Sequence, residues 1–346
     1  MPHTLNRQIT LARRPDGIPE ADDFAWSKVP IPEPADGEVL IQNLYLSLDA
    51  AIRSWMKPDC TYFPPIPIGA PVRSTALGRV VKSRNPAHRE GDYVVAYACS
   101  AWQDYSVIGA DGILHTVQPS PDFPLHYHLS IFSAMGLTPY FGMLDIGQPK
   151  PGETALISAA AGAVGSIAGQ IAKIKGCRVV GIAGSDEKCR MLVDELGFDA
   201  AFNYKGKNTE QLSRDIAELC PKGVDIFFDN VGGEILDAAL LNLAMFARIA
   251  FCGAIGDYTK SGPIPGPYNY WQILARCATV RGFLTLYYQD QFPAAIAEMK
   301  GWVDSGQLKF SEDISVGLDS TIPAFTKLFT GANTGKLLVK LTDENL

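Results

Sequence analysis

The sequence of 346 residues predicts an α/β protein with two domains, of which the first is β-rich and the second contains a doubly wound parallel sheet. Three observations lead to this prediction. The chain is longer than a single hydrophobic core usually serves. Short runs of strand-forming residues, separated by Gly and Pro turns, occupy residues 1–125, and from residue 131 strand-like and helix-like segments alternate.

Three runs in the N-terminal part have the composition of β-strands. Residues 38–49, 78–83 and 91–98 are rich in strand-forming side chains and are bounded by Gly, Pro and Asn turns. Prolines cluster in the loops between them, for example in "YFPPIPIGAP". The longer loop 118–130 separates this part from segments of different character, and we place the domain boundary at its end.

From residue 131 the pattern changes to helices and strands in alternation. A helix over 132–144 is expected to end or to be interrupted near Pro139. A buried strand over 154–160 precedes a helix over 164–175, whose apolar residues lie on one face. The alternation continues with strand 177–183, helix 186–196, strand 200–204, helix 208–220, strand 224–232, helix 234–245 and strand 248–254. This order predicts parallel strands joined by right-handed crossovers.

Composition and charge exclude several classes of protein. Hydrophobic residues make up 47% of the chain and charged residues 19%, which excludes a disordered protein. A net charge of −7 argues against a nucleic-acid partner, because phosphate binding requires clustered Lys and Arg. No apolar run reaches about 18 residues, so we expect no membrane partner. Seven cysteines without a C-x-x-C pair indicate reduced thiols and a cytoplasmic protein.

The sequence does not suggest a metal site. A zinc dehydrogenase needs a catalytic set of Cys, His and acidic residues and usually four close cysteines for structural zinc, and neither pattern occurs. His126 and His128 have ligand-like spacing, but no carboxylate or thiol partner is indicated nearby, so packing or solvation is the preferred interpretation. A short-chain dehydrogenase is also disfavoured, because no Tyr-x-x-x-Lys pair occurs.

The segment "AAAGAVGS" (159–166) is close to a dinucleotide-binding fingerprint. Gly162 allows close approach of a phosphate and Gly165 allows close packing of helix on strand, while Ala160 replaces the usual first glycine. Ala160 is acceptable there if its φ stays negative. A helix that starts near Val164 directs its free N–H groups at the phosphates. The alternative is a Gly/Ala-rich packing turn without a ligand.

The end of the second strand decides between NADH and NADPH. An acidic residue there would bind the ribose 2′-hydroxyl of NADH, but this chain has Gly184 and Ser185, with Lys188 one turn later. Glycine leaves room for a 2′-phosphate, serine can donate to it and lysine supplies positive charge. Asp186 and Glu187 argue against this, although both suit the helix N-terminus. We therefore predict NADPH; the alternative is that Lys188 is a solvated surface charge.

Several further motifs carry a resemblance to a known family. The chain resembles the zinc-independent medium-chain dehydrogenases/reductases of the prostaglandin reductase, leukotriene B4 dehydrogenase and curcumin reductase branch, over its whole length. The residues that carry the resemblance are "NRQITLARRPDGIP" (6–19), "GLTPYFG" (136–142), "AAAGAVGS" (159–166), "KGCRVVGIAGSDEK" (175–188), "LGFDAAFNYK" (196–205), "FDNVGG" (228–233), "CGAI" (252–255) and "NTGK" (333–336).

The resemblance implies the domains, the cofactor and its binding residues. It implies a GroES-like catalytic domain over 1–130 and 310–346 and a Rossmann domain over 131–309. It also implies NADPH bound by Gly162, Ala163, Val164, Gly165, Gly184, Ser185, Lys188, Tyr204, Asn230, Cys252, Gly253, Ala254, Ile255, Tyr258, Phe283, Leu284 and Asn333. By the same resemblance, the substrates are α,β-unsaturated ketones and aldehydes, whose C=C bond is reduced by hydride transfer to the β-carbon.

Tyr258 is the candidate catalytic residue. A phenol can donate a hydrogen bond to the carbonyl oxygen, on which negative charge develops after conjugate addition. Two roles are consistent with this position: Tyr258 protonates carbon, or it only holds the enolate. The alternative is a loop tyrosine that packs on residues 262–270. Tyr62, Tyr270, Trp271 and Tyr287 are expected to divide between pocket wall and core.

One segment departs from the family pattern. The branch usually has an Asp-Pro-Tyr-Met-Arg-like segment after its second strand, where this chain has Ala50 and Ala51. A pocket-wall aromatic is therefore missing unless Trp55 substitutes for it.

Two other functions and one assembly state are consistent with the sequence. The first alternative is an NADPH:quinone oxidoreductase, and the second is a catalytically inactive NADPH-binding protein. A homodimer is expected, because the Rossmann sheet ends in an edge strand that a second copy commonly covers. The apolar segment 275–288 is its expected contributor.

Overall fold

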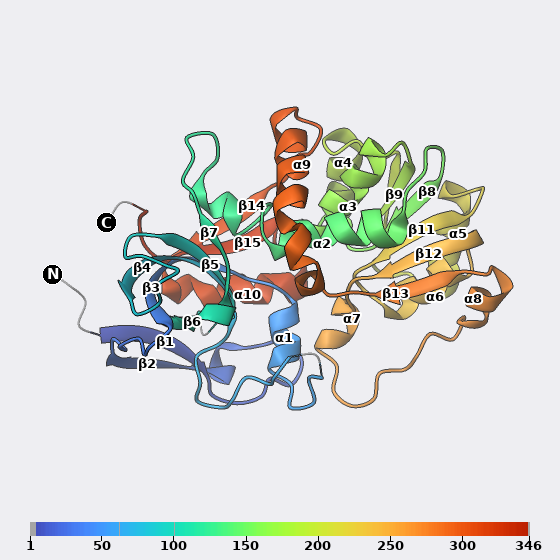
Figure 1. Ribbon diagram of the computed structural model, residues 1–346. Helices are drawn as coiled ribbons and strands as arrows, with labels where there is room; N and C mark the ends of the chain where they lie inside the picture. Colours follow the sequence, from blue (N-terminus) through green and yellow to red (C-terminus); the bar gives the residue numbers. More distant parts are fainter. Residues whose placement is uncertain (1–4, 62, 100, 345–346) are drawn as a thin grey trace. The chain divides into compact units, whose positions relative to one another are not determined.

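The computed structural model describes residues 5–61, 63–99 and 101–344, and their contacts divide them into two compact units (Figure 1). Unit 1 contains residues from 1–133 and 312–346, and unit 2 contains residues 134–311. The expected boundaries, near 130 and 310, lie close to these. The α/β fold class is confirmed, because unit 1 is β-rich and unit 2 is built on a parallel sheet. Within the described ranges, no helix is long and apolar enough to cross a membrane.

Unit 1 is built on a mostly antiparallel sheet with the order β14-β15-β3-β4-β5-β7, in which β6 pairs with β3. Its C-terminal strands return to the N-terminal part, since β15 pairs antiparallel with β3. A separate ribbon is formed by β1 and β2. The strands are β1 (Leu5–Leu11), β2 (Phe24–Pro30), β3 (Glu38–Ser47), β4 (Ser74–Ser83), β5 (Tyr93–Cys99), β6 (Tyr105–Gly109), β7 (Ile113–Val117), β14 (Glu312–Val316) and β15 (Lys336–Lys340). The helices are α1 (Ala51–Trp55) and α10 (Thr321–Thr330).

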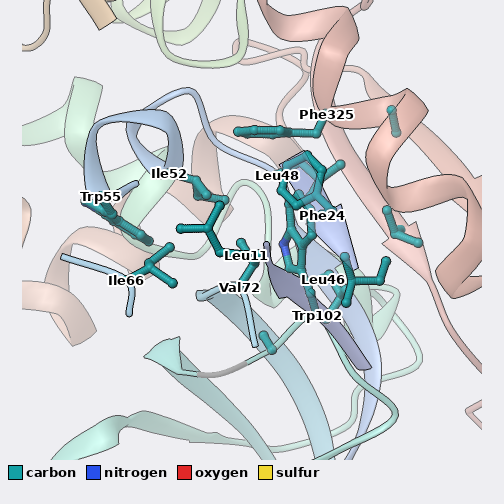
Figure 2. Close-up of a cluster of buried hydrophobic side chains, with 14 of the residues drawn as sticks. Leu11, Phe24, Leu46, Leu48, Ile52, Trp55, Ile66, Val72, Trp102 and Phe325 are labelled. Carbon is teal, nitrogen blue, oxygen red and sulfur yellow. The ribbon is translucent and has the colours of Figure 1, made fainter. Parts of the chain in front are cut away.

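The main core of unit 1 lies between the sheet, α1 and α10 (Figure 2). Trp102 is fully buried, and its ring centroid lies 5.3 Å from those of Phe24 and Phe325. Leu46 and Leu48, at the end of β3, pack in the same cluster. Burial of large aromatic and aliphatic side chains here stabilises the region that carries α1.

Unit 2 contains a six-stranded sheet with the order β10-β9-β8-β11-β12-β13, and all neighbouring strands are parallel. The strand order reverses between β8 and β11, which is the topological switch point of a doubly wound sheet. The strands are β8 (Thr154–Ile157), β9 (Arg178–Ala183), β10 (Ala200–Asn203), β11 (Val224–Asp229), β12 (Leu243–Phe251) and β13 (Thr279–Gly282).

Helices cover both faces of this sheet, with α2 packed on α3 and α5 packed on α6 (Figure 1). They are α2 (Ala134–Phe141), α3 (Ala163–Ile174), α4 (Asp186–Asp194), α5 (Thr209–Leu219), α6 (Gly233–Leu240), α7 (Ile255–Tyr258), α8 (Trp271–Ala275) and α9 (Phe292–Asp304).

One expected helix is interrupted near Pro139 as predicted, and another is shorter than predicted. Helix α2 contains Pro139, ends two residues later at Phe141 and passes into the wider π-helical turns of η4 (Gly142–Gly147). The helix expected over 234–245 ends at Leu240. There the Asn242 side-chain amide donates to the carbonyl of Ala238 at 2.8 Å, which caps the end of the helix, and β12 starts at Leu243.

Helix α3 is buried more completely than a single apolar face would require. Residues from Gly165 to Ala172 are all buried. Gln170 explains how a polar side chain is accommodated there: its Nε2 donates to the carbonyl of Lys309 at 2.7 Å, and the Lys309 N–H donates to its Oε1 at 2.8 Å. The segment that ends unit 2 therefore covers part of the helix beyond its apolar face.

Gly169 in α3 provides a test of this packing. A Cβ at this position would lie 2.0 Å from Cζ of the buried Phe198 ring, so Gly169→Ala should lower the free energy of unfolding by about 1–3 kcal/mol. Gly301→Ala in α9 is the matched control, since no atom lies within 4 Å of its Cβ, and it should stabilise by roughly 0.5–1 kcal/mol. Denaturant unfolding measures both; equal effects would contradict the packing described.

Candidate functional site

The turn after β8 brings the start of α3 very close to the strand. A Cβ at Gly165 would lie 2.4 Å from the Ala159 carbonyl oxygen, so only glycine fits. The left-handed conformation in this turn is adopted by Ala159, with φ +47°, and not by Ala160. Ala160 is fully buried, and its N–H donates to the carbonyl of Ile182 at 2.9 Å. The turn therefore accepts alanine in place of the usual first glycine.

The N-terminus of α3 fits a dinucleotide pyrophosphate. Gly162 is the N-cap residue and makes no side-chain cap, so the first N–H groups, including those of Ala163 and Val164, are available to a phosphate. Gly162 and Ala163 are partly exposed, while Gly165 is buried. A pyrophosphate site requires close packing of helix on strand and an open approach for the phosphate. The close contact at Gly165 meets the first requirement, and the open first turn of α3 meets the second.

A second candidate region for anion binding follows β9. Ser185 caps α4 by accepting the Lys188 N–H at 3.2 Å. A Cβ at Gly184 would lie 3.4 Å from Tyr204 Cε1 and 3.5 Å from Lys205 Cε, so Tyr204 and Lys205 flank this position. The sequence-based prediction included Tyr204 but missed Lys205.

The charges around Gly184 indicate an anionic ligand. Burial, and then the charge of Lys205, lower the pKa of Lys188. A bound phosphate would raise the pKa of Lys188 again, because its negative charge would offset both the burial of this ammonium group and its repulsion by Lys205. Asp186 Oδ1 accepts a hydrogen bond from Asn203 Nδ2 at 3.0 Å, and the charge of Glu187 offsets part of the lowered pKa of Lys188. Small residues and two lysines at this position fit a 2′-phosphate.

A buried polar network joins the carboxyl ends of β8 and β11. Asp229 Oδ1 accepts hydrogen bonds from Ser158 Oγ at 2.9 Å and from the N–H groups of Val231 and Gly232 at 3.0 and 3.1 Å. Asn230 Nδ2 donates to the Ser158 carbonyl at 2.7 Å. Burial raises the pKa of Asp229. This network fixes Asn230 at the switch point, where doubly wound sheets bind their ligands.

The loop 252–258 is anchored to the same strand end. The N–H groups of Cys252 and Gly253 donate to the Asp229 carbonyl at 2.8 and 3.1 Å, and the Ile255 N–H donates to the Asn230 carbonyl at 3.0 Å. Burial and the charge of Asp229 raise the pKa of Cys252 to about 12, so this thiol stays protonated and is not a nucleophile at neutral pH.

The hydroxyl of Tyr258 lies against the backbone of this same loop. Its hydroxyl accepts the Ala254 N–H at 3.4 Å, and a Cβ at Gly253 would lie 2.9 Å from the same oxygen. Glycine at 253 is therefore needed for this position of the phenol. Accepting an N–H polarises the hydroxyl and makes it a stronger hydrogen-bond donor.

The other expected cofactor-binding residues lie in different surroundings. Phe283 packs edge-on against Phe228 at 6.4 Å, next to Gly142, whereas Leu284 is exposed. Asn333 belongs to unit 1, is buried, and donates from Nδ2 to the Gly335 carbonyl at 3.1 Å.

The aromatic residues expected at the pocket wall or in the core are not core residues. Tyr270, Trp271 and Tyr287 are 65%, 63% and 85% exposed, and Tyr62 lies outside the described residues. Trp55, by contrast, is buried in the core of unit 1 and stacks on Phe63. It therefore belongs to the core rather than replacing an exposed aromatic wall.

The two histidines with ligand-like spacing have other partners. His126 Nε2 pairs with Glu312 Oε2 at 2.9 Å, and the His128 ring lies 5.9 Å from that of His115. Burial, and then His128, lower the pKa of His115 to about 4. In the ranges that the structure covers, no group of three or more His, Cys, Asp or Glu side chains could hold a metal ion.

Comparison with known proteins identifies the family. One family model, described as the N-terminal domain of oxidoreductase, matches residues 7–116, and a second, described as zinc-binding dehydrogenase, matches residues 163–301. The NADPH-dependent curcumin reductase of Escherichia coli is 36% identical over 98% of both chains. The chain belongs to the zinc-independent NADPH oxidoreductases of the medium-chain dehydrogenase/reductase family.

Further relatives extend this similarity over nearly the whole chain. The NADP⁺-dependent 2-alkenal reductase of Nicotiana tabacum is 36% identical over 98% of both chains. Prostaglandin reductase 1 of Rattus norvegicus is 38% identical over 96% of this chain and 98% of its own. The crystal structure of CurA from Vibrio vulnificus in complex with NADPH is 38% identical, with a TM-score of 0.89 and coverage of 97% and 99%.

The two lysines near Gly184 give a direct test of cofactor selection. Lys188→Ala and Lys205→Ala should each weaken NADPH binding roughly 10–150-fold, because each removes a charge-assisted contact to the 2′-phosphate, and should leave NADH binding nearly unchanged. Calorimetric titration of both nucleotides measures this. Lys222→Ala is the control, since exposed Lys222 precedes β11 at the amino ends of the parallel strands, whereas Gly184 follows the carboxyl end of β9. Equal weakening of NADH and NADPH would show that neither lysine binds the phosphate.

Proposed function

We propose that the protein reduces the C=C bond of α,β-unsaturated ketones and aldehydes with NADPH. The observation that carries this proposal is the Tyr258 hydroxyl, held over a loop that is anchored at the switch point of the sheet. The full-length similarity to a curcumin reductase and a 2-alkenal reductase supports the same reaction.

In this proposal, unit 2 binds NADPH. Gly162, Ala163, Val164 and Gly165 hold the pyrophosphate at the start of α3. The 2′-phosphate is held by residues around the end of β9, namely Gly184, Ser185, Lys188, Tyr204 and Lys205. The nicotinamide half is held by residues of unit 2, namely Asn230, Cys252, Gly253, Ala254, Ile255, Tyr258, Phe283 and Leu284.

Bound NADPH supplies the hydride for the β-carbon of the substrate. Tyr258 donates a hydrogen bond to the carbonyl oxygen, where negative charge develops during conjugate addition. The donor is fixed before the substrate arrives, because Ala254 and Gly253 position the phenol. Such a preorganised donor lowers the barrier without reorganisation at the moment of reaction.

A side-by-side assay tests the reaction. NADPH oxidation is followed by its absorbance with pentyl vinyl ketone, an enone, and with benzoquinone. We expect turnover of the enone to its saturated ketone. Quinone turnover without enone turnover at saturating NADPH would favour a quinone oxidoreductase, and tight NADPH binding without oxidation across a panel of enones would indicate an inactive protein; both results contradict the proposal.

Tyr258→Phe removes the proposed donor and keeps the ring. The substitution should lower kcat/KM for the enone by roughly 10²–10³-fold, because it removes a hydrogen bond to the developing oxyanion, while the Kd of NADPH stays nearly constant. Tyr268→Phe is the matched control, since Tyr268 is 80% exposed in the following loop and should be neutral. Full activity of the Tyr258→Phe variant would rule out this role.

We also propose that two copies of the chain pair through the β13 edge. β13 forms one edge of the sheet, and its residues Thr279–Gly282 are all exposed. Large apolar side chains are exposed around it, which is typical of a covered surface in the assembled protein. They are Phe246, Tyr270, Trp271, Leu274, Val280 and Tyr287.

If two copies pair through β13, the substitution Val280→Asp should halve the mass at which the protein sediments. Wild-type protein should sediment at about twice the 37.4 kDa of one chain at micromolar concentration. Val280→Asp should give a folded monomer, because it places a charge in the apolar contact. Val193→Asp, at another exposed valine of unit 2, is the control and should remain dimeric. A wild-type monomer would contradict the pairing.

We further propose that the protein acts in the cytoplasm. All seven cysteines are free thiols, which suits a reducing compartment. Fractionation of the cells that produce it, with detection of the chain by antibody, tests this location; recovery with extracellular proteins would contradict it.

A further inference from the structure

Asp229 is a fully buried acidic residue whose two carboxyl oxygens have different surroundings. Oδ1 accepts three hydrogen bonds, from Ser158 Oγ and from the N–H groups of Val231 and Gly232, at 2.9, 3.0 and 3.1 Å. Oδ2 is buried and accepts a hydrogen bond from no group in the residues that the structure describes. The protein therefore satisfies one oxygen of this carboxyl group and leaves the other, which is the oxygen that can carry a proton.

The charges around Asp229 favour its neutral form. Burial, and then the charge of Asp257 on α7, raise the pKa of Asp229, while the three hydrogen bonds act in the opposite direction without reversing the shift. Asp257 is also buried, and its Oδ2 would lie 3.4 Å from a Cβ at Gly232, whose N–H donates to Asp229. Lys260 compensates the charge of Asp257, with Nζ 2.8 Å from Oδ1. Asp229 has no such cation among the described residues, so an ionised Asp229 would repel Asp257 in a buried place.

Two further titratable groups lie on the elements around Asp229, and neither is a cation. The Cys252 N–H donates to the Asp229 carbonyl, and burial is the larger of the causes that raise the pKa of the Cys252 thiol to about 12. Glu234, in the first turn of α6, is exposed. Neither group supplies the positive charge that would stabilise an ionised Asp229.

The two carboxyl groups lie at the base of the turn that carries Tyr258. Asp257 directly precedes Tyr258 in α7. The Gly256 N–H donates to the Val231 carbonyl at 3.2 Å, and a Cβ at Gly256 would lie 3.0 Å from the same oxygen, so this turn packs closely on the residues that follow Asp229. Repulsion between Asp229 and Asp257 would therefore displace the turn, and Tyr258 with it.

We propose that Asp229 is a positioning residue that keeps a proton on Oδ2 at neutral pH, so that Asp257 and Tyr258 can lie close to the end of β11. The role in the reaction rests on the proposed function, whereas the proton on Oδ2 does not. Asp229 acts through the α7 turn and does not contact the substrate. Its ionisation makes the position of Tyr258 dependent on pH.

The unfolding equilibrium tests the proton. Asp229→Asn mimics the neutral acid, because its Oδ1 can accept the same three hydrogen bonds and its amide does not titrate. An unfolded chain ionises this carboxyl group above about pH 4, so the folded wild-type protein holds one more proton than the unfolded chain. The ratio of unfolding constants, wild type over Asp229→Asn, should therefore rise about tenfold for each pH unit between roughly pH 5 and 7. A constant ratio over this range would overturn the proposal.

A second variant and a spectrum keep this test independent of one substitution. Asp229→Ala removes the acceptor as well as the proton, so it should unfold at a lower denaturant concentration than Asp229→Asn at every pH. Infrared spectroscopy of the wild-type protein should show the carbonyl band of a protonated carboxyl group at neutral pH, where exposed carboxylates are ionised. Absence of this band would also overturn the proposal.

The pH dependence of the reaction tests the positioning role. With NADPH and pentyl vinyl ketone, kcat/KM of the wild-type protein should fall roughly tenfold or more between about pH 7 and 10, because ionised Asp229 displaces the donor, and Asp229→Asn should lack this fall. If the unfolding ratio changes as predicted but no enone is reduced, the proton stands and the proposed reaction fails. If both proteins reduce enones with the same pH profile, the reaction stands and the positioning role fails.

Discussion

The close contact between the first turn of α3 and the turn after β8 constrains the rest of unit 2. Position 165 has no room for a side chain, because the Ala159 carbonyl occupies that space. Ala159 reaches this geometry at φ +47°, a conformation that costs an alanine on the order of 1 kcal/mol. This close contact directs the N-terminus of α3 toward the carboxyl end of the sheet. It also packs the helix so closely that Gly169 lies against the Phe198 ring.

A second constraint is carried by Asp229 at the switch point. One carboxylate oxygen accepts three donors from Ser158, Val231 and Gly232, so a single side chain fixes the ends of both central strands. Its main-chain carbonyl and that of Asn230 then anchor the loop that carries Tyr258. Because the network is buried, small changes there are expected to move the phenol as well as Asn230. The proposed catalytic donor thus depends on a residue that is itself fully buried.

The sequence predicted the parts of the site that have local signals. Gly162 and Gly165 identify the turn from their spacing alone, and Ser185 is both the expected phosphate neighbour and the observed cap of α4. Lys205 was missed because its proximity to Gly184 arises from the pairing of β10 with β9, which sequence spacing does not reveal.

Tertiary packing overrode other local signals. Strands β1 and β2 were not predicted, because segments such as "LNRQITL" mix polar and apolar residues without regular alternation. Trp55 looked like a replacement for a missing wall aromatic, whereas the packing of α1 buries it. In each case the deciding contacts come from residues distant in the sequence.

The central claim is that hydride is delivered to the β-carbon of an enone while Tyr258 holds the carbonyl oxygen. The most direct measurement uses NADPH with both hydrogens at nicotinamide C4 replaced by deuterium, reduces pentyl vinyl ketone, and locates the label in the product by NMR. The account predicts a saturated ketone with deuterium on the former β-carbon. Deuterium on the carbonyl carbon of an allylic alcohol, or cofactor oxidation without a new carbon–deuterium bond, would contradict it.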